Sequence, residues 1–404
     1  MEKDGARNMP MNHGKAFGLL VYRPLRFCAD LFFRLKYGFR HDRMRLPAGG
    51  TVVVANHTMD MDPFFCICCF PDQMGIVMSE HLMRKPFLSK AIRFLIDVII
   101  RVKTRTESQT AFAMIRSLKA GKNILIFPEG SMTYTGVSKD IVGGLGRLIK
   151  ISGANLVTVR LENTFAYSPR WSESSGRGKG YARVVHTYSG GELKDKKPEE
   201  IEKIIRDDIY FDQYAQPLPA IRNRKRAEYL ENFLYLCPSC GGLSTMHGHG
   251  THFVCSCGLD LELDGNMRFH GKDGKDAPLD NLQEWYLWQT EETEKRAEEW
   301  KKAEDAITAD DGIAFNSYTV SPPASKLLMT GQVRLFADRL EICGEQGRRV
   351  IALEDITDVT TVQHRILSFS VKHEEFYEIV GTDTFSTVKY AYLMHVLAGV
   401  KMNV

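Results

Sequence analysis

Residues 51–63 read TVVVANHTMDMDP, a short apolar run that ends in two polar residues. Such a run, preceded by a Gly-Gly turn, is typical of a buried strand. A second stretch, ILIFPEGS at residues 124–131, repeats the pattern, and the segment 108–119 before it has helical spacing. The order strand, helix, strand predicts an α/β domain. Open α/β sheets carry their sites at the carboxyl ends of the strands, where Asn56, His57 and Glu129 fall.

His57 and Asp62 have the chemistry of a general base and the group that orients it. An imidazole titrates near neutral pH, so it can remove a proton from an attacking hydroxyl. A carboxylate on the other ring nitrogen fixes the tautomer and stabilises the imidazolium that forms. Asp60 is an alternative partner, because spacing alone does not decide between two nearby carboxylates.

These residues also resemble the motifs of the glycerolipid (lysophosphatidate, 1-acylglycerol-3-phosphate) acyltransferase family. His57 and Asp62 match its H-x4-D motif, and residues 127–131 match F-P-E-G-[ST]. The resemblance implies an α/β fold with a mixed sheet flanked by helices, and acyl transfer from acyl-CoA or acyl-carrier protein to a lysophospholipid hydroxyl. It implies His57 as base, Asp62 as orienter, and a set of acceptor-binding residues: Asn56, Lys103, Arg105, Glu129, Gly130 and Ser131.

Three positions depart from the family pattern. Met132 stands where an arginine usually follows F-P-E-G-[ST], and Asp97 and Lys103 stand where an intermediate motif has glycine and arginine. Lysine lacks the bidentate fork with which arginine binds phosphate. These changes leave the acceptor open and keep a second hypothesis in view, a non-catalytic membrane-docking adaptor with a degenerate acyltransferase domain.

The segment from Lys15 to Arg45 is basic and rich in apolar residues. It holds eight Lys or Arg and two Asp, although the whole chain carries only +3. Apolar residues between Phe17 and Leu35 recur every three or four positions, which predicts an amphipathic helix, or a helix pair broken at Pro24. Two interpretations stay open: an interfacial anchor on anionic lipids, or a helix packed on the core.

Four cysteines have the spacing of metal ligands. C-P-S-C at residues 237–240 and C-S-C at residues 255–257 form two knuckles. A segment this small buries too little apolar area to fold without a bound metal ion that links its ends. The pattern predicts a zinc ribbon with a closed, structural Zn2+ site made by Cys237, Cys240, Cys255 and Cys257. His247, His249 or His252 are possible substitutes for one thiolate. Cys66, Cys68 and Cys69 fit no ligand set and are interpreted as core residues.

The remaining chain divides by composition. A charged helix over about 280–306 is followed by short strands near 333–336, 339–343 and 349–352 and by a helix over 388–397, which resembles a PH-like β-barrel. The predicted division is 1–50 amphipathic membrane-contacting helices, 51–222 acyltransferase domain, 223–265 zinc ribbon, 266–325 helical linker and 326–404 PH-like domain.

Composition also narrows location and partners. No run of about 18 apolar residues is uninterrupted, and the start of the sequence lacks a secretory pattern. The expectation is a cytoplasmic protein, peripheral on the cytoplasmic membrane face. Its expected partners are anionic lipids, a lysophospholipid acceptor and an acyl thioester donor. The ribbon lacks the interleaved basic and aromatic residues of a nucleic-acid surface, so no nucleic-acid partner is expected.

Overall fold

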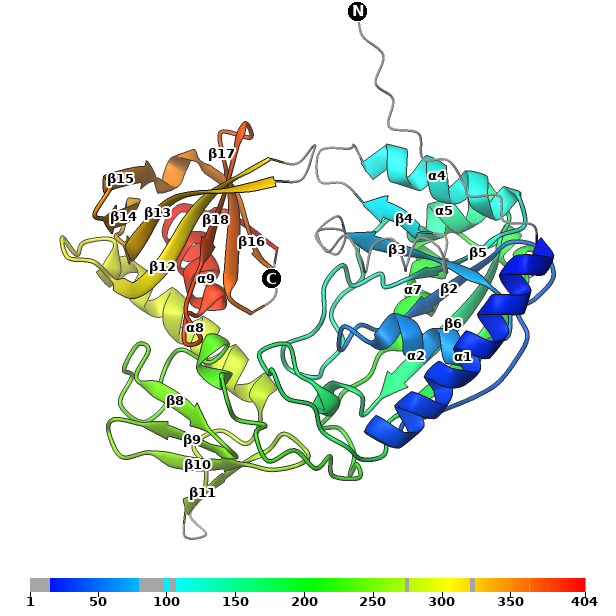
Figure 1. The fold of residues 1–404 in the computed structure, drawn as a ribbon, viewed down its shortest axis with the longest axis horizontal. Coiled ribbons are helices and arrows are strands. Elements are labelled where there is room, and N and C mark those ends of the chain that lie inside the picture. The colour runs from blue at the N-terminus through cyan, green and yellow to red at the C-terminus, as the bar shows by residue number, and fades with distance from the viewer. Residues whose placement is uncertain are drawn as a thin grey trace, which may run out of the picture. The chain divides into compact units, whose positions relative to one another are not determined.

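The computed structural model describes residues 15–79, 98–101, 107–272, 276–319, 324–362 and 364–403 (Figure 1). The chain forms two compact units that interleave in sequence. The first contains residues 1–130, 138–162 and 180–211, and the second contains 131–137, 163–179 and 212–404. Each is described by itself.

The first unit is built on a mixed seven-stranded sheet with the order β1-β7-β6-β2-β5-β3-β4. In the described part of this sheet the β6–β7 pair is antiparallel and the other pairs are parallel. This is the mixed α/β sheet expected from the sequence. Its elements are α1 (Lys15–Tyr37), β1 (Arg40–His41), β2 (Thr51–Ala55), α2 (Asp62–Cys69), β3 (Met74–Ser79), β4 (Val98–Arg101), α4 (Glu107–Lys119), β5 (Asn123–Ile126), α5 (Leu145–Ser152), β6 (Asn155–Glu162), β7 (Tyr181–Tyr188), α6 (Gly190–Lys194) and α7 (Pro198–Ile209).

The central strands are buried on both faces, which explains their continuous apolar runs. Every residue of β2 is buried. Val52 and Val54 join a core cluster with residues of α4, α5, α6 and α7, including Leu118, Leu148 and Ile205. The sheet begins with β1, because Arg40 pairs with Tyr181 of β7, so the predicted start of the domain at residue 51 is too late.

Helix α1 is one continuous helix with Pro24 inside it. Its inward face is aromatic: Phe33 meets Phe65 of α2 edge to face at 5.0 Å between ring centroids. Its other face leaves five apolar side chains 45–63% exposed, namely Leu25, Phe27, Leu31, Phe32 and Leu35. The apolar stripe therefore faces away from the core of this unit. None of the described helices has the length and apolar character needed to cross a bilayer.

The second unit contains two sheets and their connecting helices. A four-stranded antiparallel sheet, order β11-β10-β9-β8, carries the cysteine knuckles, and α8 follows it. The elements of this part of the second unit are η2 (Phe165–Tyr167), η3 (Leu230–Asn232), β8 (Met246–His249), β9 (His252–Cys255), β10 (Asp260–Leu263), β11 (Phe269–Gly271) and α8 (Leu282–Trp300).

The C-terminal strands form one eight-stranded sheet, order β15-β14-β13-β12-β18-β17-β16-β19, that packs on α9. Its strand β12 (Thr308–Thr319) lies in the segment predicted as a helical linker, so only the α8 part of that prediction is helical. Within the described residues β15 and β19 do not pair, so this sheet is open where a barrel was expected. The other elements are β13 (Ala324–Leu335), β14 (Arg339–Gly344), β15 (Gly347–Ala352), η5 (Leu353–Asp355), β16 (Ile356–Val362), β17 (Ile366–Val371), β18 (Glu375–Val380), α9 (Thr387–Ala398) and β19 (Lys401–Asn403).

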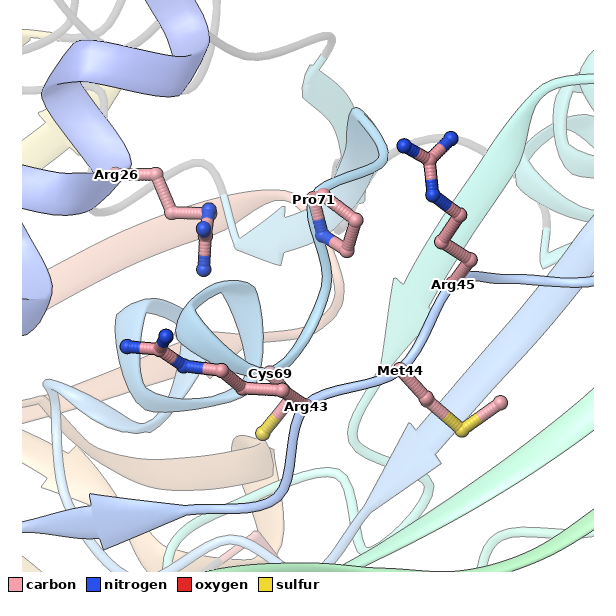
Figure 2. A pocket seen from close by; sticks show the side chains of 6 residues that line it. All are labelled: Arg26, Arg43, Met44, Arg45, Cys69 and Pro71. Carbon is pink, nitrogen blue, oxygen red and sulfur yellow. The ribbon is translucent and has the colours of Figure 1, made fainter.

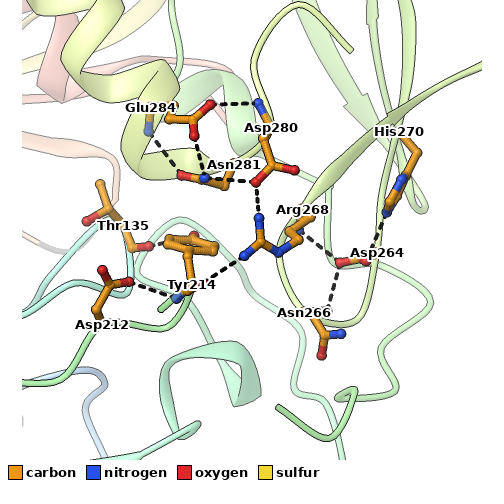
Figure 3. A network of polar contacts seen from close by, with 10 residues as sticks. All are labelled: Thr135, Asp212, Tyr214, Asp264, Asn266, Arg268, His270, Asp280, Asn281 and Glu284. Atoms are coloured by element: carbon orange, nitrogen blue, oxygen red, sulfur yellow. Dashed lines mark hydrogen bonds and ion pairs between the residues drawn. The ribbon is translucent and has the colours of Figure 1, made fainter. Parts of the chain in front are cut away.

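A polar network centred on Arg268 ties the four-stranded sheet with its cysteine segments, the part predicted as a zinc ribbon and called the ribbon from here on, to the start of α8 (Figure 3). The Arg268 guanidinium pairs with the Asp280 carboxylate and donates to the Tyr214 carbonyl at 2.8 Å. Asn281 caps α8 by accepting the Glu284 N–H at 3.0 Å, which satisfies an otherwise unpaired helix-end donor. The ribbon and α8 are therefore joined by more than chain connectivity.

Gly50→Ala tests the packing of the strand that carries the site. A Cβ on Gly50 would lie 2.1 Å from the Leu118 carbonyl oxygen, and this backbone atom has little room to move. We expect a loss of about 1–3 kcal/mol in the free energy of unfolding, measured by urea denaturation. Gly191→Ala is the control, because its Cβ would meet only the Ser189 Oγ at 3.8 Å. Equal stability of the two variants would contradict this packing.

Candidate active site

Parallel pairing of β2 and β5 brings the two sequence motifs together. Val54 lies opposite Ile126, so the segments that follow the two strands leave the same edge of the sheet. There the Glu129 carboxylate accepts the His57 backbone N–H at 3.0 Å on Oε1 and the Lys139 N–H at 2.8 Å on Oε2. The Phe127 ring stacks on the His57 ring at 4.3 Å between centroids.

His57 is held by Asp62. The distance from His57 Nδ1 to Asp62 Oδ2 is 2.9 Å, and the Asp62 side chain is fully buried while that of His57 is 21% exposed. Asp62 also accepts the backbone N–H groups of Thr58 and Met59 and the Thr58 hydroxyl. These donors fix the position of the Asp62 side chain. Asp60 is exposed, so the carboxylate on the imidazole is Asp62.

Because Nδ1 of His57 contacts Asp62, the other ring nitrogen, Nε2, is left to act as a proton acceptor. With Nδ1–H donated to Asp62, the neutral imidazole carries its lone pair on Nε2. No hydrogen bond to Nε2 is formed within the described part of the chain. A partly exposed base with an oriented tautomer has the arrangement required for removing a proton from a hydroxyl.

Asn56 precedes His57, and its side chain forms hydrogen bonds within the sheet. Its side-chain amide donates to the Leu161 carbonyl at 3.0 Å and accepts the Leu161 N–H at 2.7 Å. The residue is buried, and its polar atoms connect β2 to β6. Substrate binding by Asn56 stays a prediction, and both polar groups of its side chain are bonded to Leu161 in this structure.

The other expected acceptor-binding residues are Gly130, Ser131, Lys103 and Arg105. Gly130 follows Glu129 with φ +76°, a left-handed conformation that suits glycine. Ser131 belongs to the second unit. Lys103 and Arg105 lie outside the described residues. The structure thus brings His57, Asp62, Asn56, Glu129 and Gly130 together and leaves the expected cations unplaced.

Some features of the site had no clear signal in the sequence. The backbone donors of Thr58, Met59 and Lys139 come from the path of the chain, which residue identity does not reveal. The stacking of Phe127 on His57 could have been predicted. Both residues follow a strand, and the two strands are neighbours in the sheet, so their rings can come within stacking distance.

The cysteines fall into two groups. Cys66, Cys68 and Cys69 are buried in α2, and burial raises the pKa of Cys68 to about 12, so these thiols stay neutral. Cys237, Cys240, Cys255 and Cys257 have their sulfur atoms within 4.8 Å of one another, an arrangement that can hold a metal ion.

One segment of the chain matches a known protein family. Residues 39–162 match the model of the Acyltransferase family. This segment is an acyltransferase-family domain. The matched range of the acyltransferase domain starts one residue before β1 and ends at the last residue of β6, so it contains His57, Asp62 and Glu129.

Two relatives illustrate the extent of the likeness. The chain is 26% identical over 161 residues to a 1-acyl-sn-glycerol-3-phosphate acyltransferase from Borreliella burgdorferi, which covers 39% of this chain and 64% of that protein. The chain thus spans less than two thirds of that relative's length. A crystal structure of the 1-acyl-sn-glycerophosphate acyltransferase PlsC from Thermotoga maritima aligns with 17% identity and a TM-score of 0.42, covering 49% of this chain and 81% of that one.

The Glu129 carboxyl makes stability depend on pH. Burial raises its pKa to about 8, against the lowering effect of the Lys139 and His57 backbone N–H groups. A raised pKa in the folded state means that folding binds this proton more tightly. The contribution to stability is therefore complete below the unfolded pKa near 4.5 and is lost as the pH rises through about 8.

We expect the unfolding free energy of the wild type to contain a component that falls between about pH 5 and 8 and is missing from Glu129→Gln. Urea unfolding across this range measures it. Asp60→Asn removes an exposed acid from the segment after β2 and should keep the component. A Glu129→Gln profile parallel to that of the wild type would contradict the assignment.

Proposed function

We propose that this chain transfers a fatty acyl group from a thioester to the hydroxyl of a lysophospholipid, with 1-acylglycerol-3-phosphate as the favoured acceptor. The observation that carries the proposal is the 2.9 Å contact between His57 Nδ1 and the buried Asp62 carboxylate, inside the segment that matches the family. The activity in the name of the Borreliella relative supports the choice of acceptor.

In the proposed reaction the substrate hydroxyl replaces an enzyme serine. His57 Nε2 takes the hydroxyl proton as the oxygen attacks the thioester carbonyl carbon, and Asp62 stabilises the imidazolium. The tetrahedral intermediate then collapses, the carbon–sulfur bond breaks, and the proton passes from His57 to the leaving thiolate. The products are an ester and a free thiol, and His57 returns to its neutral form.

Glu129 has a positioning role in this proposal. Its two oxygens each accept a backbone N–H, one from the residue that carries the base and one from the segment after β5. We therefore assign Glu129 to holding the His57 backbone, and Lys103 and Arg105 remain candidates for the acceptor phosphate. Acyl-CoA and acyl-carrier protein both fit as donors.

The exposed apolar face of α1 supports a membrane contact. Large apolar side chains rarely form an exposed stripe on a soluble surface, and here basic residues flank the stripe. We propose that α1 lies in the lipid interface of the cytoplasmic membrane face with its apolar face in contact with acyl chains. This placement would bring a lipid acceptor to the domain.

We assign the four-cysteine cluster to a structural zinc ion. The Cys237–Cys257 and Cys240–Cys255 sulfur distances are 3.9 and 3.8 Å. Tetrahedral Zn2+ with bonds of about 2.3 Å requires sulfur atoms about 3.8 Å apart, whereas a disulfide requires about 2.05 Å. Four thiolates close the coordination shell, so the ion would hold the ribbon together without taking part in acyl transfer.

Substitution of the dyad tests the activity. With a lysophospholipid and an acyl thioester, His57→Ala should lower kcat by at least about a hundredfold, and Asp62→Asn should also lower it. His186→Ala is a matched control, because His186 Nδ1 also lies 2.9 Å from a carboxylate, that of Asp208, but on β7. The control should keep full activity.

Turnover by His57→Ala equal to that of the wild type would exclude the general-base assignment. A folded wild type that acylates no lysolipid in a panel would favour the adaptor hypothesis. Circular dichroism of each variant separates loss of catalysis from loss of fold.

Elemental analysis tests the metal. Natively purified protein should contain about one zinc per chain, and Cys255→Ser should lose most of it. Chelation should lower the thermal midpoint of the wild type. Cys343→Ser replaces a cysteine of β14 outside the cluster and should retain the metal. Zinc-free wild type with an unchanged midpoint would show that the ribbon folds without it.

A further inference from the structure

The first unit contains an arginine-lined cavity that the proposed catalysis does not use. Its volume is about 350 Å³. It lies among α1, the segment after β1 and the end of α2, and it is lined by Arg26, Arg43, Met44, Arg45, Cys69 and Pro71 (Figure 2). Among the residues that the structure describes, no carboxylate lines it. Arg43 pairs with Asp30, so Arg26 and Arg45 supply the positive charge that an anion in this cavity would meet.

Of the nearby acids, Asp30 pairs with the lining residue Arg43 at 2.7 Å, whereas within the described residues no acid pairs with Arg26 or Arg45. Asp30 is buried, and the surrounding cations hold the pKa of its carboxyl below the usual range against the opposing effect of burial. The donors are Arg34, His41 and Arg43 for Asp30, Tyr181 and Val184 for Asp42, and Leu46 for Asp72. Burial raises the pKa of the Cys69 thiol, so this lining residue adds no negative charge.

The arginines retain donors for a ligand. Arg26 Nη1 donates to the Cys68 carbonyl at 2.8 Å, whereas its buried Nε has no partner. Arg43 uses Nη2 on Asp30, and no bond of the Arg45 guanidinium is found in the described parts of the chain. Figure 2 shows the Arg26 and Arg43 guanidinium groups reaching toward a common space, with Arg45 on the other side of Pro71.

We propose that this cavity binds the phosphate group of an anionic lipid headgroup, apart from the acceptor site. Guanidinium groups pair with phosphate oxygens in a bidentate fork, which favours phosphate over other anions. Arg26 belongs to the helix whose opposite face exposes apolar side chains, so the same helix would contact both the headgroup and the acyl region. The inference rests on the proposed membrane contact and is independent of acyl transfer.

Sedimentation with vesicles tests the cavity. Wild type, Arg26→Gln/Arg45→Gln and Arg23→Gln/Arg40→Gln are compared on phosphatidylcholine vesicles with and without phosphatidic acid, in the absence of an acyl donor. The second pair removes the same charge from exposed positions outside the cavity. Loss of charge alone should weaken both pairs alike. We expect the cavity pair to lose at least about tenfold more affinity, and only on vesicles that contain phosphatidic acid.

Equal losses in the two pairs would overturn the proposal. Arg45→Gln alone is the second variant, because Arg45 is exposed and its substitution should not disturb folding. It should show part of the extra loss of vesicle affinity. Inorganic phosphate, tested by thermal shift, distinguishes the sources. Stabilisation by inorganic phosphate without a vesicle difference would overturn the headgroup assignment. His57→Ala should bind vesicles like the wild type, so failed catalysis and failed headgroup binding give different results.

Discussion

The parallel pairing of β2 with β5 is the constraint on which the site depends. Because both strands run in the same direction, the polar segments after them meet at one edge, and the Glu129 carboxylate joins them by accepting two backbone N–H groups. That bridge fixes the backbone of His57. Asp62, held by its own backbone donors, then fixes the ring.

The same unit separates chemistry from membrane contact. The proposed base lies at the carboxyl edge of the sheet, whereas α1 packs its aromatic face on α2 and leaves its apolar face exposed. An apolar face in contact with water is unfavourable, so a lipid interface is a physically reasonable environment for it. The arginine-lined cavity at the inner side of this helix fits the same environment.

The second unit is held together by polar contacts between its sheets and helices. Buried Lys389 of α9 pairs with Asp310 at 2.8 Å and donates to Ser244 of the ribbon segment at 2.9 Å. Such a buried charge is tolerated because it is paired and hydrogen-bonded. Together with the Arg268 network, this makes the ribbon, α8 and the C-terminal sheet one compact unit.

The sequence by itself determined the strands that carry the two motifs, the helix before the second of them, the candidate base His57 and the four clustered cysteines, because apolar periodicity and ligand spacing are local properties. The strand pairing, the contact of His57 with Asp62 and not Asp60, and the hydrogen bonds of Asn56 and Glu129 depend on contacts between segments that the sequence does not place together. Only the tertiary structure decided these. It also decided that the apolar stripe of α1 faces outward, since amphipathic spacing is the same whether a helix packs on protein or on lipid.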